Sequence, residues 1–258
     1  MLPDSHSGDV LTNREARSAL GAAFARADRT APVDVIFSDT CLNGSVEVFT
    51  ELREFTETVV ASSLLVPGTG WDYKRWLDKL NRRMPADGKA WAEQAVEAFG
   101  EAYPQVGFEQ AQLAAYSTRE GDIVKAFAQV VKALSAMKET RRTLLKRAAN
   151  RVQSVQYREN LDLEQLVDQL AYLAERESPL YKACQSFLRV YRESLVAISD
   201  SPEGGEDLSG LTIWCPIRGD DMNVSRTYPK LEFAKKTKWL KLLRDIEKDP
   251  ASATPISI

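Results

Sequence analysis

The chain has 258 residues, of which 44% are hydrophobic and 28% are charged, and its net charge at neutral pH is −3. This composition is ordinary for a globular protein with a sizeable core, and the slight negative charge argues against nucleic-acid or membrane-surface binding as the main activity. There is no apolar run of membrane-spanning length and no secretory signal at the start.

The first part of the chain reads as a loop, a helix, a strand and a second helix. Residues 1–12 are polar, and the capping box Thr12-Asn-Arg-Glu15 opens the first predicted helix. Residues 33–37 form a β-branched run that is typical of a strand buried on both faces. An amphipathic helical pattern begins at Ser45. A short strand is predicted at 58–61, before a loop.

The middle of the chain, about 72–199, is mostly helical in pattern, and a second capping box at Ser117-Thr-Arg-Glu120 precedes one of its helices. Because strands alternate with helices, we expect an α/β fold whose sheet has parallel members and helices on its faces. The predicted segments from residue 73 onward are helices at 73–84, 89–99, 123–134, 161–174, 180–198 and 231–246, strands at 112–118 and 211–216, and a loop at 200–209.

Cys41 stands where the predicted strand ends and just before the predicted helix. Open α/β sheets bind ligands at the carboxyl ends of their strands, and the positive end of the following helix favours a thiolate over a thiol. Both features are typical of a nucleophile. Free cysteine is also among the most buried residue types, so a small core residue is the alternative interpretation.

Asp39 alternates onto the same side of an extended chain as Cys41. Taken alone, it is most simply a solvated strand-end or helix-capping acid. The other two cysteines, Cys184 and Cys215, are predicted to be core residues. Three widely spaced cysteines and a single histidine, His6, indicate neither a disulfide framework nor a metal site.

Four stretches of the chain, taken in order, form a recognisable series. They are Ser7-Gly-Asp-Val-Leu-Thr12 with Glu15; Asp39-Thr-Cys41-Leu-Asn-Gly44 with Val46-Glu47-Val48 and Glu51-Leu52; Ala61-Ser62 and Leu65-Val66-Pro67-Gly68 with Gly70-Trp71; and Gly210-Leu-Thr-Ile with Tyr228, Leu231, Phe233-Ala234 and Trp239. In this order they resemble the clostripain-like cysteine peptidases of the caspase-like clan. The resemblance runs from about Ser7 to Arg244 and is weakest in the helical middle.

The resemblance implies a caspase-like α/β sheet with helices on both faces and a helical middle insertion. One peptidase domain would span 1–249, and 250–258 would be a disordered tail. A Cys-His dyad would cleave peptide bonds through a thioester, with Cys41 as nucleophile and its backbone N–H as part of the oxyanion hole. Asp39 matches the acid of the P1 pocket, which implies cleavage after Arg or Lys, and a bidentate fork favours Arg. No cofactor and no metal are implied.

The histidine of such a dyad is expected about 50 residues before the cysteine. His6 is followed by Ser7 in a polar segment, whereas the family has its histidine before a glycine at a strand end. His6 is therefore a weak candidate for the general base, and an exposed loop histidine is the simpler interpretation. The expected position lies before Met1.

Two explanations stay open. In one, a light chain or upstream segment supplies the histidine, and this chain alone is inactive. In the other, the chain is a truncated pseudo-peptidase that serves as a non-catalytic, caspase-like interaction module. Both would leave an open apolar sheet edge that needs covering. An oxidoreductase or transferase is disfavoured because the chain has no Gly-rich cofactor loop and no CxxC pair.

Other expectations concern partners and location. The partner is a peptide or protein with a basic P1 residue, without nucleic acid or membrane. Basic residues gather at Lys138 and from Arg141 to Arg151; such a cluster is usually a solvated helix face, and a nucleic-acid patch is the weaker alternative. Cysteine usage favours a reducing, cytoplasmic location, unless a secretory signal precedes Met1.

Overall fold

The computed structural model describes residues 2–3, 10–68, 70–82, 84–102, 111–199, 208–218 and 224–249. The strands are β1 (Leu2–Pro3), β2 (Val10–Leu11), β3 (Val33–Ser38), β4 (Thr56–Ala61), β5 (Leu113–Ser117), β6 (Asn160–Asp162), β7 (Leu195–Ser199) and β8 (Thr212–Trp214). The helices are α1 (Asn13–Arg26), α2 (Val46–Leu52), α3 (Tyr73–Arg82), α4 (Gly88–Ala102), α5 (Ile123–Ala136), α6 (Arg141–Ala149), α7 (Leu163–Leu173), α8 (Pro179–Ser194), α9 (Glu232–Thr237) and α10 (Trp239–Lys248), with 3-10 helices at Pro216–Arg218 and Tyr228–Lys230.

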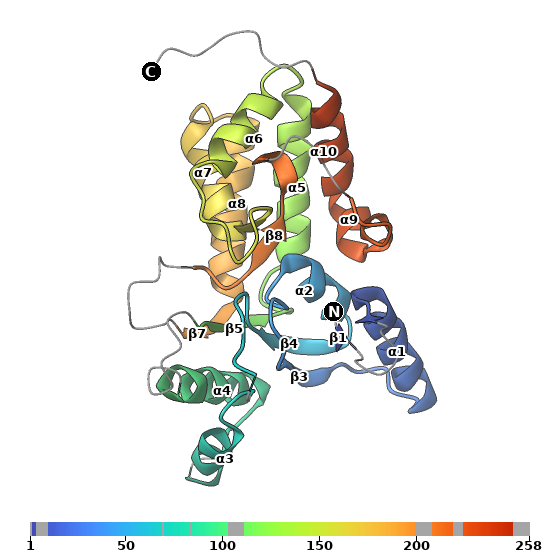
Figure 1. The fold of residues 1–258 in the computed structure, drawn as a ribbon, viewed down its shortest axis with the longest axis vertical. Helices are drawn as coiled ribbons and strands as arrows, with labels where there is room; N and C mark the ends of the chain where they lie inside the picture. Colours follow the sequence, from blue (N-terminus) through green and yellow to red (C-terminus); the bar gives the residue numbers. More distant parts are fainter. Residues whose placement is uncertain are drawn as a thin grey trace.

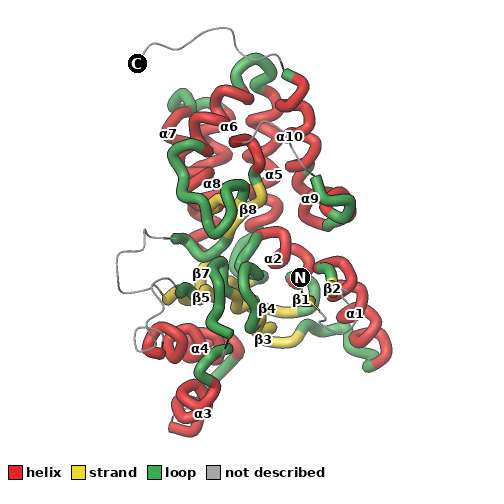
Figure 2. The backbone as a smooth tube through the Cα atoms, viewed as in Figure 1, coloured by secondary structure: helices red, strands yellow, loops and turns green. Residues whose placement is uncertain are grey.

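The central sheet has the strand order β3-β4-β5-β7. β3 and β4 are parallel, whereas β4 with β5 and β5 with β7 are antiparallel. In Figure 1 the sheet lies across the lower half of the molecule, with α3 and α4 below it and α2 above it. The long helices α5 to α8 extend upward from the sheet, and α10 lies beside them (Figures 1 and 2). The predicted α/β fold with helices on both faces is confirmed.

Each strand of the sheet contributes to two hydrophobic cores, because successive side chains point to opposite faces. In β4, Val59 and Ala61 join the core with α2 and the upper helices, and Val60 joins the core with α4. In β5, Tyr116 belongs to the first core and Ala115 to the second. The β3 strand thus reaches its end between two packed layers.

The local signals predict the first helix and the position of the first strand, but not the burial of that strand. The strand at 33–37 is expected to be buried on both faces, whereas the side chains of β3 are half-buried or exposed, because β3 pairs only with β4 among the described residues. Thr12 and Glu15 form both bonds of the predicted capping box at the start of α1. The predicted strands at 33–37 and 112–118 are β3 and β5. The predicted loop 1–12 differs, because it contains β1 and β2, which pair with each other.

Three predictions on the helices are wrong. The helix expected at 180–198 ends at Ser194, and the rest becomes β7, whose pairing with β5 outweighs the helical pattern. Asp122, rather than Ser117, caps α5. The final helix is two helices, because Lys238 takes the left-handed conformation (φ +60°) between α9 and α10.

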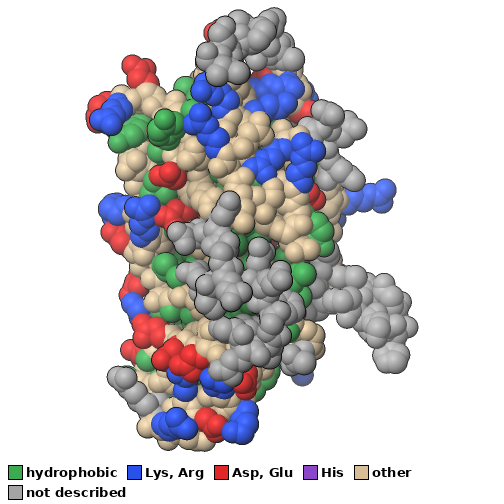
Figure 3. All heavy atoms as spheres, turned by 60° about the vertical axis from the view of Figure 1, so that its left-hand side comes forward, with side chains coloured by type: hydrophobic (Ala, Val, Ile, Leu, Met, Phe, Trp, Pro, Cys, Tyr) green, Lys and Arg blue, Asp and Glu red, His purple; other side chains and the backbone are tan. Residues whose placement is uncertain are grey.

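The basic cluster around α6 is partly used inside the molecule. Arg141 donates to both carboxylate oxygens of Asp249 at 2.8 Å, and Arg142 also binds the end of α10. On the face shown in Figure 3, Lys and Arg side chains gather toward the upper end and mix with acidic ones lower down.

Among the described residues, no helix is long and apolar enough to cross a membrane. The predicted loop at 200–207 and tail at 250–258 lie outside the described residues.

Candidate active site

A tight turn connects β3 to α2 and presents the candidate nucleophile. The Asn43 amide donates to Ser38 Oγ at 2.8 Å and also to Thr40 Oγ1, so the turn is closed by its own side chains. Leu42 lies in the left-handed region (φ +62°), a conformation that costs energy for a non-glycine residue and is often found at functional sites. Ser45 caps α2 by accepting from the N–H of Val48.

Gly44 ends this turn at a crossing of three backbone segments. Its N–H donates to the Ser62 carbonyl at 2.7 Å, and its own carbonyl accepts from the N–H of Thr212 at 2.9 Å. A Cβ at this position would lie 2.5 Å from the backbone nitrogen of Ser63 and 2.9 Å from the carbonyl oxygen of Gly210. Only glycine fits at this position of the chain without a shift of the backbone.

Cys41 is exposed, so the alternative interpretation of Cys41 as a core residue is wrong. Its sulfur accepts from the N–H of Val66 at 3.2 Å and lies 3.5 Å from the Val66 carbonyl oxygen. The loop that follows β4 therefore holds the thiol in place. The sequence does not predict this contact, because a backbone hydrogen bond leaves no signal in side-chain type.

Asp39 faces the same loop a few residues further on. Its Oδ2 accepts from the Tyr73 hydroxyl at 2.7 Å and from the N–H of Trp71 at 3.3 Å. Its Oδ1 is buried and has no hydrogen-bond partner within the part of the chain that the structure describes. Asp39 does not cap α2, since Ser45 does. Asp39 and Cys41 both accept hydrogen bonds from backbone N–H groups of the loop between β4 and α3.

Aromatic side chains pack beneath Asp39. Trp71 contacts Phe37 and Phe99 edge-on, with ring centroids 6.1 and 6.3 Å apart, and lies parallel to the Tyr73 ring. The indole N–H groups of Trp71 and Trp76 are buried without a hydrogen-bond partner among the described residues. No pattern in the sequence connects these rings with Asp39, because they come from β3, the loop after β4, α3 and α4.

The other two cysteines have a different character. Cys184 and Cys215 are fully buried, as predicted for core residues, and burial raises the pKa of each thiol to about 12. Both therefore stay protonated at neutral pH. Of the three cysteines, only Cys41 offers an exposed sulfur.

The motif helix α2 buries two glutamates. Glu47 accepts from the Tyr228 hydroxyl at 2.8 Å and from the N–H of Trp214 at 3.1 Å, and its burial raises the pKa of its carboxyl. Glu51 accepts from the N–H of Glu232 at 2.6 Å and lies 3.8 Å from Arg17, and burial raises its pKa as well. These bonds join α2 to the closing segment of the chain.

The part of the chain that the structure describes places no histidine at the site. His6 lies outside the described residues, and the chain has no other histidine. No group of His, Cys, Asp and Glu side chains suited to a metal ion occurs in the described ranges.

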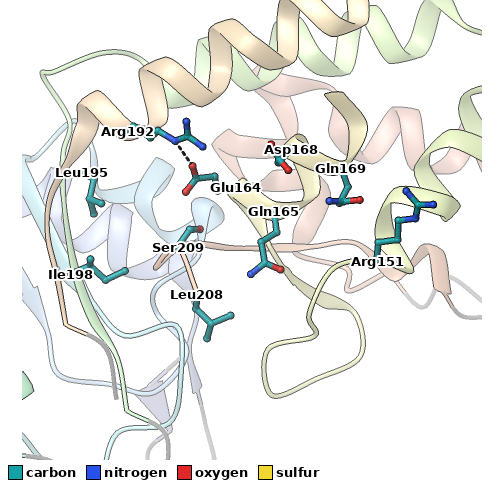
Figure 4. Close-up of a pocket in the computed structure, with 10 residues that line it drawn as sticks. All are labelled: Arg151, Glu164, Gln165, Asp168, Gln169, Arg192, Leu195, Ile198, Leu208 and Ser209. Carbon is teal, nitrogen blue, oxygen red and sulfur yellow. Dashed lines mark hydrogen bonds and ion pairs between the residues drawn. The ribbon is translucent and has the colours of Figure 1, made fainter. Parts of the chain in front are cut away.

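A cavity of about 490 Å³ lies away from Cys41, between α7, α8 and the segment before β8 (Figure 4). Its two arginines and two acids balance in charge, and Arg192 pairs with Glu164 at 2.6 Å. It shares one wall with the site, because Gln112 accepts from Ser63 and donates to the Leu208 carbonyl. The cavity is lined by Arg151, Glu164, Gln165, Asp168, Gln169, Arg192, Leu195, Ile198, Leu208 and Ser209.

Solved structures with this fold are cysteine proteases. A B. fragilis cysteine protease superposes with a TM-score of 0.68 at 15% identity, covering 93% of this chain and 97% of its own. A clostripain from Bacteroides thetaiotaomicron, in complex with the peptide inhibitor BTN-VLTK-AOMK, has a TM-score of 0.63 at 15% identity, covering 92% and 99%. An inactive zymogen C11 protease from Parabacteroides distasonis has a TM-score of 0.59 at 16% identity, covering 86% and 61%. A comparison with curated proteins gives no match.

The fold and the exposed cysteine after β3 thus place the chain among proteins with the architecture of caspase-like cysteine proteases. A family model, the clostripain family, matches residues 3–245. The chain belongs to the clostripain family of cysteine peptidases, as the sequence motifs predicted.

Proposed function

We propose that this chain is the catalytic-cysteine part of an endopeptidase that cleaves after arginine or lysine. The observation that carries the proposal is the pairing of one exposed thiol, Cys41, with the nearby carboxylate of Asp39, one oxygen of which has no partner among the described residues. A buried acceptor left unpaired costs free energy that a ligand donor recovers. A clostripain that binds a VLTK peptide inhibitor supports a basic P1 residue.

In the proposed reaction, the Cys41 sulfur attacks the carbonyl carbon of the scissile bond, and a C–S bond forms as the carbonyl oxygen becomes an oxyanion. The Cys41 backbone N–H supplies part of the oxyanion hole. The base that took the thiol proton gives it to the leaving amine, the C–N bond breaks, and a thioester remains. Water, deprotonated by the same base, then hydrolyses the thioester and restores the thiol.

The base must come from a segment that is outside the described residues, a light chain or an upstream stretch. The edge of β3 offers a place for it, because β3 pairs only with β4 in the described part of the chain. A cavity of about 280 Å³ runs along that edge, lined by Val33, Asp34, Val35, Phe37, Gly88 and Trp91. The chain of the zymogen C11 protease extends beyond the part that resembles this protein, because the match covers 61% of that chain.

An added strand would use the unpaired backbone groups of β3 and bury its partly exposed apolar side chains. If the added strand is parallel to β3, its carboxyl end lies beside the turn that bears Cys41. A histidine at that end would reach the thiol. Because the histidine must reach the Cys41 thiol, the proposal assigns the free edge of β3 as the docking edge for the His-bearing segment.

The proposal is tested with a peptidyl-lysine or peptidyl-arginine acyloxymethyl ketone. In the complete peptidase, meaning this chain with the His-bearing segment, the probe is expected to label Cys41, and Cys41→Ala abolishes both labelling and hydrolysis. Asp39→Asn is expected to slow labelling by at least about tenfold, because it removes the charge that pairs with the P1 cation. Mass spectrometry of the labelled peptide reads the site.

Labelling only at Cys184 or Cys215 would favour the second candidate function, a non-catalytic interaction module on the same fold. The isolated chain is expected to be inactive. Hydrolysis of an arginine amide by the isolated chain, lost in Cys41→Ala, would contradict the need for an outside base.

A further inference from the structure

The two oxygens of the Asp39 carboxylate have different surroundings. Oδ2 is occupied by the Tyr73 hydroxyl at 2.7 Å and the N–H of Trp71 at 3.3 Å. The Gly70 backbone (φ +72°) also closes this side, since a Cβ there would lie 2.8 Å from Oδ2. Oδ1 is buried and without a hydrogen-bond partner in the described ranges. A ligand that binds this carboxylate therefore finds one acceptor oxygen.

Tyr73 is 46% exposed, and contacts with two neighbouring aromatic rings support the side chain whose hydroxyl donates to Asp39. Tyr73 is the first residue of α3, and its N–H donates to the Trp71 carbonyl at 2.8 Å. Its ring stacks on that of Trp71, with centroids 6.3 Å apart and planes inclined by 25°, and tilts against Trp76. Aromatic contacts of this kind add to the stability of a side-chain position. The hydroxyl is thus a built part of the site.

We propose that Tyr73 is a specificity-determining residue that makes the site prefer a P1 lysine to a P1 arginine. This inference rests on the proposed function, cleavage after a basic residue. A lysine ammonium is a compact point charge that can bind Oδ1 alone. An arginine guanidinium gains most when its planar fork binds both oxygens of a carboxylate side by side. Because Tyr73 holds Oδ2, the fork loses one of its two bonds.

The enclosure of Oδ1 acts in the same direction. The atoms around a buried oxygen must part for any cation, and they part less for an ammonium than for the wider guanidinium. The sequence alone favoured arginine, because a free aspartate offers both oxygens. The structure reverses that order through a residue 34 positions away along the chain.

The test compares two peptide amides that differ only in P1, lysine or arginine, with the complete peptidase. The native site is expected to favour lysine in kcat/KM. Tyr73→Phe keeps the ring and removes the shorter of the two hydrogen bonds to Oδ2, which leaves that oxygen able to accept from a guanidinium. The ratio of lysine to arginine kcat/KM is therefore expected to fall by about tenfold, the worth of one charge-assisted hydrogen bond. Tyr172→Phe is the matched control, since that tyrosine is 73% exposed on α7, and it leaves the ratio unchanged.

A second measurement needs no general base. Binding of the same two peptides to Cys41→Ala, with and without Tyr73→Phe, is followed by calorimetry, and the same change in ratio is expected. Preference of the native site for arginine, or a ratio unmoved by Tyr73→Phe, would overturn the inference while leaving the basic P1 pocket in place. Equal turnover of a P1-alanine peptide would instead refute the pocket itself, and the inference with it.

Discussion

The turn after β3 and the helix α2 that follows it differ in how their acidic side chains are hydrogen-bonded. On α2, Glu47 and Glu51 are buried, and each accepts hydrogen bonds from the closing segment of the chain. In the turn, Asp39 has one oxygen satisfied and one buried without a partner among the described residues. The two regions are adjacent in sequence, and both belong to the family motif.

The difference separates acids that hold the fold together from an acid that is kept for a ligand. Buried polar groups in folded proteins are nearly always hydrogen-bonded, so each exception needs a reason. The glutamates follow the rule and connect α2 to the segment around Tyr228 and Glu232. Asp39 is the exception, beside an exposed thiol and a residue with positive φ.

Gly44, at the boundary between the two regions, gives the largest expected effect. Gly44→Ala would place a Cβ 2.5 Å from the Ser63 backbone nitrogen, and we expect a loss of about 3 kcal/mol in the free energy of unfolding because backbone cannot yield as a side chain can. Denaturant unfolding measures it. Gly68→Ala is the control, since a Cβ at Gly68 meets nothing within 4 Å, and it should be nearly neutral. Similar losses in both variants would mean that the crossing at Gly44 is not tight.

Much of the unit around β3 could be predicted from sequence. The β-branched run, the amphipathic pattern after Ser45 and the Thr12 capping box are local signals, and the structure follows each of them. The place of Cys41 at the end of β3 follows from the same signals. Local chemistry dictates these features, so no knowledge of distant residues is needed.

What escaped prediction depends on contacts between distant residues. The Tyr73 hydroxyl on Asp39 and the Val66 backbone on Cys41 join positions 34 and 25 residues apart. β7 was mistaken for helix because its pairing with β5 overrides a local pattern. The α2 glutamates also bind distant residues. Tyr228 donates to Glu47 and Glu232 donates to Glu51, each across 181 positions of the chain.

Tyr228→Phe tests whether the α2 region is a structural one. The variant removes the hydroxyl that donates to the buried Glu47 carboxylate, and the loss of a hydrogen bond to a buried charged group is expected to cost about 2 kcal/mol in unfolding free energy. Tyr157→Phe, at a tyrosine that is 52% exposed, should change stability little. Equal stability of the Tyr228→Phe and native proteins would show that Glu47 does not depend on this donor.

Glu47→Gln gives a smaller effect that depends on pH. Burial raises the pKa of Glu47 above that of the unfolded chain, so the folded state binds the proton more tightly and stability falls as pH rises from the unfolded pKa through the folded one. Glutamine keeps an acceptor oxygen for Tyr228 and Trp214 but cannot ionise. The stability of Glu47→Gln relative to the native protein is therefore expected to increase as the pH rises above the carboxyl pKa of the unfolded chain.

Urea unfolding of both proteins at several pH values measures this difference, and the subtraction cancels the other titrating groups. A difference that does not change with pH, or that decreases as pH rises, would contradict the raised pKa.

Asp39→Asn is expected to have the smallest effect on stability, although it strongly slows turnover of basic P1 substrates. Asparagine keeps an oxygen for the Tyr73 hydroxyl and removes a charge whose second oxygen has no partner among the described residues, so the unfolding free energy should change by less than about 0.5 kcal/mol. Denaturant unfolding and kcat/KM are measured on the same preparation. A loss of stability as large as that of Tyr228→Phe would make Asp39 a structural acid like the glutamates. Unchanged stability with lost turnover would mean that the charge of Asp39 acts on the substrate cation and not on folding. A charge that does not stabilise the folded chain and yet is needed for turnover must interact with the substrate.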